Sequence, residues 1–160
     1  MSEQKILDLL KSNQLTKAKQ FIENLLKSEK ENITYIFYYG LILANERKYR
    51  DAINFFEKAL AADKNHYDSN FNIAGCYQGL LIFDKAIEYY KNCSKINTNK
   101  FEPYHQIGIC YKQLRKYEDS ISNLKKALKI SVNAKSFYML GNVYRENGQF
   151  EKDKRSFEKS

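Results

Sequence analysis

Small residues recur along this chain at an almost constant spacing. They are Gly40, Ala74, Gly108 and Gly141, separated by 34, 34 and 33 residues. An aromatic residue follows each of them after nine positions, at Tyr49, Phe83, Tyr117 and Phe150. A large apolar residue follows after sixteen positions, at Phe56, Tyr90, Leu124 and Phe157. A repeat of this length predicts a stack of similar units, because one such unit cannot bury its apolar face alone.

Each repeat contains two apolar stripes at helical spacing, separated by a short polar break. Gly148 suits the left-handed backbone that often ends a helix, and Pro103 stands where a helix is expected to begin. Small residues at a crossing let two helices approach closely. The sequence therefore predicts an all-α chain of antiparallel helix pairs. The expected pairs are 3–12 with 15–28, 33–46 with 49–62, 67–80 with 83–96, 101–114 with 117–130, and 135–147 with 150–160.

This pattern resembles the tetratricopeptide repeat, a helix–turn–helix unit of 34 residues. The resemblance covers residues 33–160, and residues 1–32 fit a degenerate unit in which Ile6 replaces the small residue. It implies a right-handed superhelical solenoid of about five repeats and ten helices. We expect a single domain over residues 1–160. Its repeats would be 1–32 (degenerate), 33–66, 67–100, 101–133 and 134–160 (incomplete).

The last repeat departs from the pattern. Asp153 and Lys154 occupy slots that hold small and aliphatic residues in other repeats, and the sequence ends before the last helix would be complete. We expect either a fragment of a longer chain or a minimal protein without a dedicated capping helix. An open C-terminal end exposing Phe150 and Phe157 would also offer a surface for a second copy of the chain.

The resemblance implies that the first helix of each pair lines a concave surface, and solenoids bind partners on such surfaces. We therefore predict a scaffold that binds a protein or peptide partner in this groove. Aromatic residues would anchor the partner, although the same aromatic row can also pack within its own repeats. The candidate partner-binding residues are Phe37, Leu41, Asp68, Phe71, Gln78, Glu102, His105, Ile109, Lys112, Lys135, Tyr138, Asn142 and Arg145.

The best-known ligand mode of this family is mostly missing. It is a carboxylate clamp of Lys, Asn and Arg side chains that grips the acidic C-terminal tail of heat-shock chaperones. In one register only Asn72 matches the clamp, and in the next register only Lys135 matches. A receptor for chaperone tails is therefore disfavoured.

Nothing in the sequence favours an enzyme. His66 and His105 share no Cys or carboxylate at metal-ligand spacing, and no phosphate-binding or nucleophile motif is present. The three cysteines lack CxxC spacing and are expected to be buried and reduced. We expect no catalytic residues, no metal and no cofactor.

The formal net charge is +8, and the basic residues are spread along the chain. Lys125, Lys126 and Lys129 form a patch on one expected second helix, so RNA is a less favoured partner. A self-associating or tethering module of a larger protein, which could be enzymatic, is the main alternative. With no long apolar run and no secretory signal, we expect no membrane span and a cytoplasmic protein.

Overall fold

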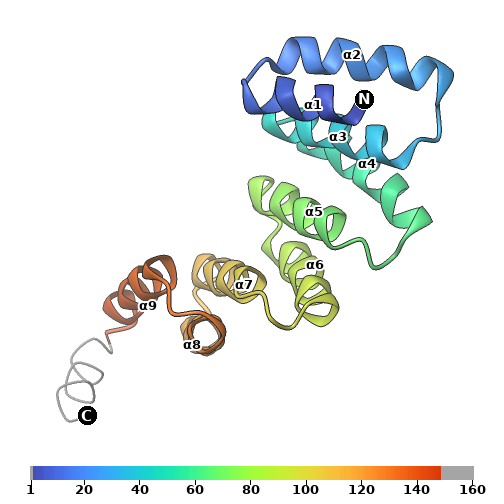
Figure 1. Cartoon of the computed structure of the whole chain (residues 1–160). Helices are drawn as coiled ribbons and strands as arrows, with labels where there is room; N and C mark the ends of the chain where they lie inside the picture. The colour runs from blue at the N-terminus through green and yellow to red at the C-terminus, as the bar shows by residue number, and fades with distance from the viewer. Residues whose placement is uncertain (1, 149–160) are drawn as a thin grey trace. The chain divides into compact units, whose positions relative to one another are not determined.

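The computed structural model of the chain describes residues 2–148, and over this range it contains nine helices and no strands (Figure 1). The helices are α1 (Ser2–Lys11), α2 (Leu15–Ser28), α3 (Ile33–Asn45), α4 (Tyr49–Ala62), α5 (Tyr67–Gly79), α6 (Phe83–Ile96), α7 (Glu102–Gln113), α8 (Tyr117–Ile130) and α9 (Ala134–Glu146). Each predicted helix end within this range agrees with the observed end to within one residue. The tenth predicted helix, at 150–160, lies outside the described residues.

The turns between paired helices explain why each helix ends where it does. One residue of each turn adopts the left-handed backbone conformation, with φ between 56° and 61° at Asn13, Arg47, Leu81 and Arg115. This conformation redirects the chain within two or three residues, so the second helix returns alongside the first. Gly148, with φ of 67°, follows α9 in the equivalent position.

Side-chain caps begin three of the first helices. Asn32, His66 and Asn133 each accept a hydrogen bond from the backbone N–H three residues later, which satisfies a group that the helix itself leaves unpaired. The helix α7 instead has Pro103 in its first turn. Its missing N–H would have had no partner there.

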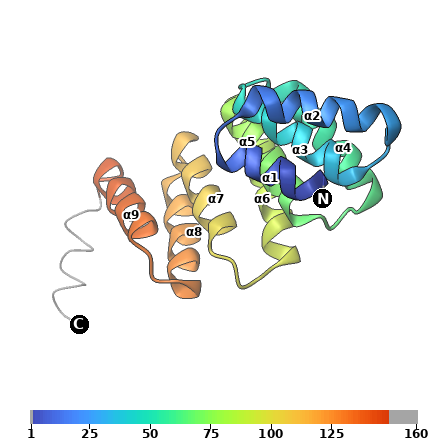
Figure 2. The same ribbon diagram turned by 45° about the horizontal axis from the view of Figure 1, so that its top comes forward.

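The chain divides into two compact units, residues 1–80 and 81–160, and we describe each by itself. In the first unit each helix from α1 to α5 packs on the next, and α1 also contacts α3, which contacts α5. In the second unit α6 to α9 pack in sequence, and α7 contacts α9 (Figure 2). The first helices of successive repeats therefore form one layer within each unit. The prediction of one domain over residues 1–160 stays a prediction.

Two small residues of the repeat, Gly40 and Gly108, lie where paired helices cross, as predicted. A methyl group added to Gly40 would lie 2.8 Å from Cε1 of Phe56, and one added to Gly108 would lie 2.7 Å from Cγ of Leu124. The hydroxyl of Ser120 donates a 2.7 Å hydrogen bond to the carbonyl of Gly108 across the same crossing. The α3–α4 and α7–α8 pairs therefore have no room for a larger residue at the crossing.

The three cysteines are buried and free, as expected. Burial raises the pKa of the Cys76 thiol to about 11 and that of the Cys110 thiol to about 12. Both side chains therefore stay protonated at neutral pH and serve as small core residues.

Candidate functional site

The first-helix layer of the first unit contains a pocket of about 200 Å³. Its walls come from the N-terminal halves of α1, α3 and α5, three first helices from successive repeats. The lining residues are Glu3, Ile33, Thr34, Phe37, Tyr38, His66 and Asp68. Two of them, Phe37 and Asp68, are among the partner-binding residues that the sequence predicts.

Aromatic rings are part of the lining of this pocket, at Phe37, Tyr38 and His66. The Phe37 ring lies 5.6 Å from the Phe56 ring, 5.3 Å from the His66 ring and 5.8 Å from the Tyr38 ring, measured between centroids. Phe56 is fully buried, whereas Phe37 and Tyr38 are half-buried. Phe37 therefore packs within its repeats and still contributes to an accessible surface.

The hydroxyl of Tyr38 donates a 3.2 Å hydrogen bond to a carboxylate oxygen of Glu3, which links α3 to α1. The pKa of Tyr38 is raised above 10.0, first by burial, then by the hydrogen bond to Glu3, and further by the negative charges of Glu3 and Asp68. The fields of both carboxylates therefore reach the same phenol oxygen.

His66 is held by its role as a helix cap. Its Nδ1 accepts a hydrogen bond from the backbone N–H of Ser69 at 3.2 Å and lies 2.7 Å from the Ser69 hydroxyl oxygen. Because Nδ1 acts as an acceptor, the hydrogen of the neutral ring lies on Nε2. The cap fixes the imidazole at the pocket edge, next to Phe37.

The remaining predicted residues of the first unit lie on the same helices without lining the pocket. The ring of Phe71 stacks on Tyr67, one helical turn earlier on α5, with centroids 6.0 Å apart and an interplanar angle of 16°. Leu41 on α3 and Gln78 on α5 are half-buried. Phe71, like Phe37, combines packing within the repeat with partial exposure.

In the second unit, two polar contacts join α7 to α9. Nδ1 of His105 lies 3.0 Å from the hydroxyl oxygen of Ser136. Nζ of Lys112 lies 2.8 Å from a carboxylate oxygen of Glu146. His105 is only 8% exposed, and its pKa is lowered, first by burial and then by the positive charge of Lys135. The structure therefore places His105 in the interior, where it can offer little surface to a partner.

The other predicted residues of the second unit are more accessible. Tyr138 is 72% exposed on α9, and Lys135 and Arg145 of the same helix are also exposed. Arg145 donates a hydrogen bond to the side-chain oxygen of Asn142. Glu102 is exposed at the start of α7, and Ile109 is half-buried. The α9 surface therefore presents an aromatic side chain among cationic and polar groups.

Five pocket residues are not among the predicted partner-binding residues: Glu3, Ile33, Thr34, Tyr38 and His66. Glu3 could have been predicted from the sequence, because it stands three positions before Ile6, just as Phe37 stands three positions before Gly40. His66 stands 34 positions after Asn32, in the cap position of the next repeat. Extending the offset count to the degenerate repeat and to the caps would have found both residues.

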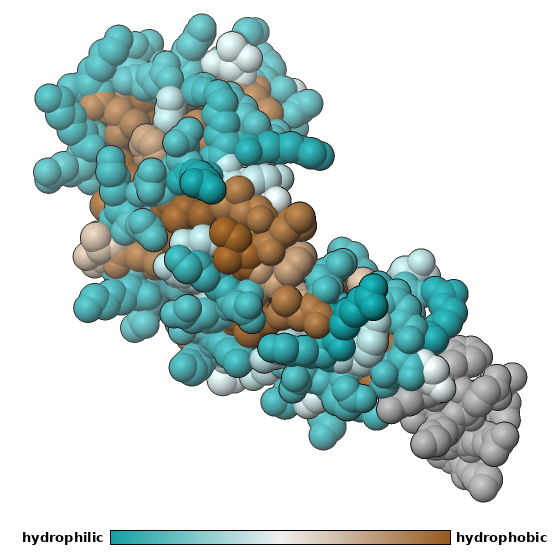
Figure 3. Space-filling view, turned by 180° about the vertical axis from the view of Figure 1, so that it is seen from behind, coloured by the Kyte–Doolittle hydropathy of each residue, from teal (hydrophilic) through white to brown (hydrophobic). Residues whose placement is uncertain are grey.

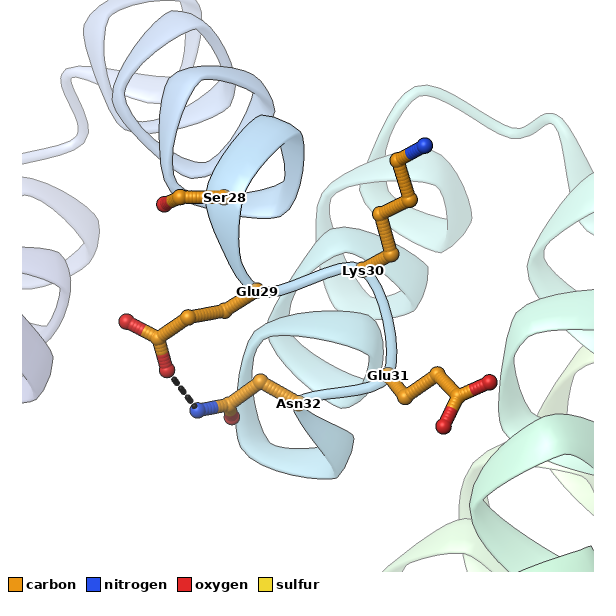
Figure 4. Close-up of a pocket in the computed structure, with 5 residues that line it drawn as sticks. All are labelled: Ser28, Glu29, Lys30, Glu31 and Asn32. Carbon is orange, nitrogen blue, oxygen red and sulfur yellow. Dashed lines mark hydrogen bonds between the residues drawn. The ribbon is translucent and has the colours of Figure 1, made fainter.

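A larger hollow of about 540 Å³ lies at the loop between α2 and α3. Figure 4 shows its five lining residues, which are consecutive in sequence: Ser28, Glu29, Lys30, Glu31 and Asn32. Glu29 accepts a 2.8 Å hydrogen bond from the Asn32 side chain, while Lys30 and Glu31 point away from it (Figure 4). Since one loop supplies every lining residue and the side chains do not converge, this hollow is not a candidate site.

Two Ser–His contacts resemble nucleophile–base pairs. They join His66 to Ser69 and His105 to Ser136. Both serines are 0% exposed, so no substrate can reach their hydroxyl groups. A nucleophile needs access to its substrate as well as a base, and these contacts therefore stabilise helix starts and helix packing.

Over residues 2–148, no three His, Cys, Asp or Glu side chains gather in a way that could hold a metal ion. None of the helices in this range is long and apolar enough to cross a membrane. On the face drawn in Figure 3, hydrophilic residues form most of the coloured surface and hydrophobic residues show between them.

Two family models match the sequence. Residues 45–127 match "Anaphase-promoting complex, cyclosome, subunit 3", and residues 134–160 match "Tetratricopeptide repeat". No curated protein matches the chain in sequence.

Solved structures with the same fold include MamA from Desulfovibrio magneticus RS-1. It has a TM-score of 0.87 and 18% identity, over 99% of this chain and 90% of that one. A further crystal structure of MamA has a TM-score of 0.83 and 16% identity, over 95% and 90% of the two chains. YrrB, described as "a TPR protein with an unusual peptide-binding site", has a TM-score of 0.75 and 23% identity, over 92% and 76%.

Proposed function

We propose that this chain is a protein-interaction scaffold, because it belongs to the tetratricopeptide-repeat proteins. The family model "Anaphase-promoting complex, cyclosome, subunit 3" matches more than half of it, and the "Tetratricopeptide repeat" model matches its last residues. The chain binds a segment of a partner protein along its first helices and catalyses no reaction. Solenoid proteins of this kind bind partners on the surface that their repeats build together.

The observation that carries this proposal is the pocket shared by α1, α3 and α5. A pocket lined by side chains from three successive repeats can contact a bound segment that runs along the helix layer, whereas a pocket within one repeat cannot. Half-buried aromatic residues in its lining give contact area at low entropic cost. Its charged margin can orient the bound segment. The peptide-binding site in the description of YrrB is consistent with this use of the fold.

A cytoplasmic location is part of the proposal. Its support is chemical: burial keeps the free thiols of Cys76 and Cys110 protonated, and free cysteines are usual in a reducing compartment. Nucleic acid is not the favoured ligand, because the predicted basic patch is small: Lys125, Lys126 and Lys129 are three exposed residues of one helix, α8.

The test is selection of binders from a random peptide library displayed on phage. Two matched variants locate the binding surface: Thr34→Tyr on α3 and Asn54→Tyr on α4, which add the same neutral bulk at exposed positions of the same unit. We expect Thr34→Tyr to weaken binding of the selected peptides about tenfold or more, and Asn54→Tyr to leave it unchanged. Recovery of no binders, or equal weakening by both variants, would overturn the proposal.

A further inference from the structure

The pocket of the first unit has a charge that differs from that of the whole chain. The chain carries 27 basic and 19 acidic residues, and residues 1–80 carry 11 basic and 10 acidic ones. The seven residues that line the pocket include two carboxylates, Glu3 and Asp68, and neither Lys nor Arg. The pocket is therefore locally negative on a basic protein.

These carboxylates are available to a ligand. The ion pairs found over residues 2–148 use Glu46 and Glu146, not the carboxylates of the pocket. Glu3 accepts a hydrogen bond from the neutral hydroxyl of Tyr38, which orients it without cancelling its charge. Asp68 approaches from α5, a different helix. A cation in the pocket would therefore gain two negative partners that approach it from different helices.

Aromatic rings supply the second element of cation recognition. Phe37 and Tyr38 are held edge to face, with an interplanar angle of 62°. An edge contact with His66 and a tilted contact with Phe56 hold the Phe37 ring from other directions. Rings fixed in this way attract a cation through their negative faces, and they also pack against the aliphatic part of a long basic side chain.

The volume limits the size of the ligand. About 200 Å³ is below the roughly 300–1,000 Å³ of typical small-molecule sites. It accommodates one long side chain rather than a complete cofactor. A side chain of a bound peptide fits this limit.

The helix N-termini at the pocket favour anions, and this effect opposes the binding of a cation. Each N-terminus carries a partial positive charge of about half an elementary charge, and its effect falls off within the first turn. The caps Asn32 and His66 occupy backbone N–H groups at the starts of α3 and α5. Glu3 and Asp68 already stand in the first turns of α1 and α5, so their full negative charges outweigh the partial positive ones at the pocket mouth.

We propose that the pocket formed by Glu3, Phe37, Tyr38 and Asp68 receives a lysine or arginine side chain of the partner segment. This inference rests on the proposed function and specifies its ligand. The cationic head lies between the two carboxylates, and the aliphatic stem lies on the two rings. The charge of this site is therefore negative, whereas the charge of a clamp for an acidic tail is positive.

The probes that test this are the N-acetyl methylamides of lysine, arginine and norleucine. Each is titrated into the full ¹⁵N-labelled chain while backbone amide resonances are recorded. We expect saturable shifts at Thr34, Tyr38 and Asp68 with the lysine and arginine probes. Norleucine, which lacks the charge, should leave them in place. Comparing the two basic probes shows which side chain is preferred.

Charge-neutralising variants provide the matched control. Glu3→Gln/Asp68→Asn removes both carboxylates of the pocket, and Asp51→Asn/Glu57→Gln removes the same two residue types from exposed positions on α4. We expect the pocket variant to weaken binding of the basic probes about tenfold, from the loss of ion-pair energy. The α4 variant should bind as the parent does. Circular dichroism verifies that both variants are folded.

The outcomes separate this inference from the proposed function. If library peptides bind along the first helices but show no lysine or arginine preference and tolerate Glu3→Gln/Asp68→Asn, the basic-pocket inference is wrong and the scaffold proposal stands. If the basic probes bind in the pocket while no peptide binds, the scaffold proposal fails instead. Equal shifts with norleucine, or no shifts with either basic probe, would refute the inference directly.

Discussion

Replacing Gly40 by alanine tests whether the small residues of the repeat are required by the close approach of paired helices. The added methyl group would lie 2.8 Å from Cε1, 3.0 Å from Cδ1 and 3.2 Å from Cζ of Phe56. Phe56 is 0% exposed, so its ring cannot move into solvent to relieve the contact. Either the ring leaves its preferred rotamer or α3 moves away from α4.

The magnitude follows from two opposing effects. Overpacking a well-packed core costs about 1–3 kcal/mol. Alanine is preferred over glycine within a helix by about 1 kcal/mol, which offsets part of this cost. We therefore expect Gly40→Ala to lower the free energy of unfolding by up to about 2 kcal/mol. For a chain of this length, this corresponds to a fall in Tm of up to about 8 °C.

A double-mutant cycle with Phe56→Leu isolates the contact. The smaller side chain leaves a cavity and destabilises the protein by itself, but it makes room for the methyl group. The double variant should therefore be more stable than the sum of the single effects predicts, by about 1 kcal/mol or more. Urea denaturation followed by far-UV circular dichroism measures all four proteins. Additive effects of the two changes would refute the close-crossing argument.

Three further predictions concern stability and reactivity. Leu81 is 72% exposed and has a φ of 61°. Because this left-handed conformation costs leucine more than asparagine, Leu81→Asn should raise the free energy of unfolding, measured by urea denaturation, by about 1 kcal/mol. Because the pKa of His105 is lowered below 6.5 by burial and by Lys135, the native state binds fewer protons than the unfolded state. Stability should fall as the pH drops from about 6.5 toward the native pKa, and His105→Gln should reduce that slope. Cys76 and Cys110, with pKa values of about 11 and 12, should react with a thiol reagent only after unfolding; fast reaction of the native protein would contradict their burial.

The helices could be predicted from the sequence because one period fixes them several times over. Each repeat places its small residue, its aromatic residue and its turn at the same offsets. A helix boundary that is ambiguous in one repeat can therefore be assigned from the others. The close approach of Gly40 to Phe56, and of Gly108 to Leu124, followed from the same offsets. Periodicity therefore determined the local structure and the packing of paired helices.

The candidate site was less predictable, because offsets identify a row of residues but not the neighbours of each side chain. His105 occupies the same slot as Phe37, yet its contact with Ser136 of α9 places it in the interior. Lys112 occupies a groove slot, yet it forms an ion pair with Glu146. Both partners come from the next repeat, at a separation of more than 30 residues. Such contacts depend on how α7 and α9 pack, which a single sequence does not specify.

The pocket depended on the least regular part of the chain. Glu3 belongs to the degenerate first repeat, where Ile6 replaces the small residue and hides the period. His66 reaches the pocket edge because it caps α5, a role more often filled by asparagine, serine, threonine or aspartate. These two departures from the repeat pattern supply a carboxylate and an imidazole to the pocket.

The most direct test of the scaffold account is to map a peptide selected from the library onto the ¹⁵N-labelled chain by backbone amide shifts. The account predicts that the largest shifts lie on the first helices α1, α3, α5, α7 and α9, beginning at Thr34, Tyr38 and Asp68. Saturable shifts confined to the second helices α2, α4, α6 and α8 would contradict it.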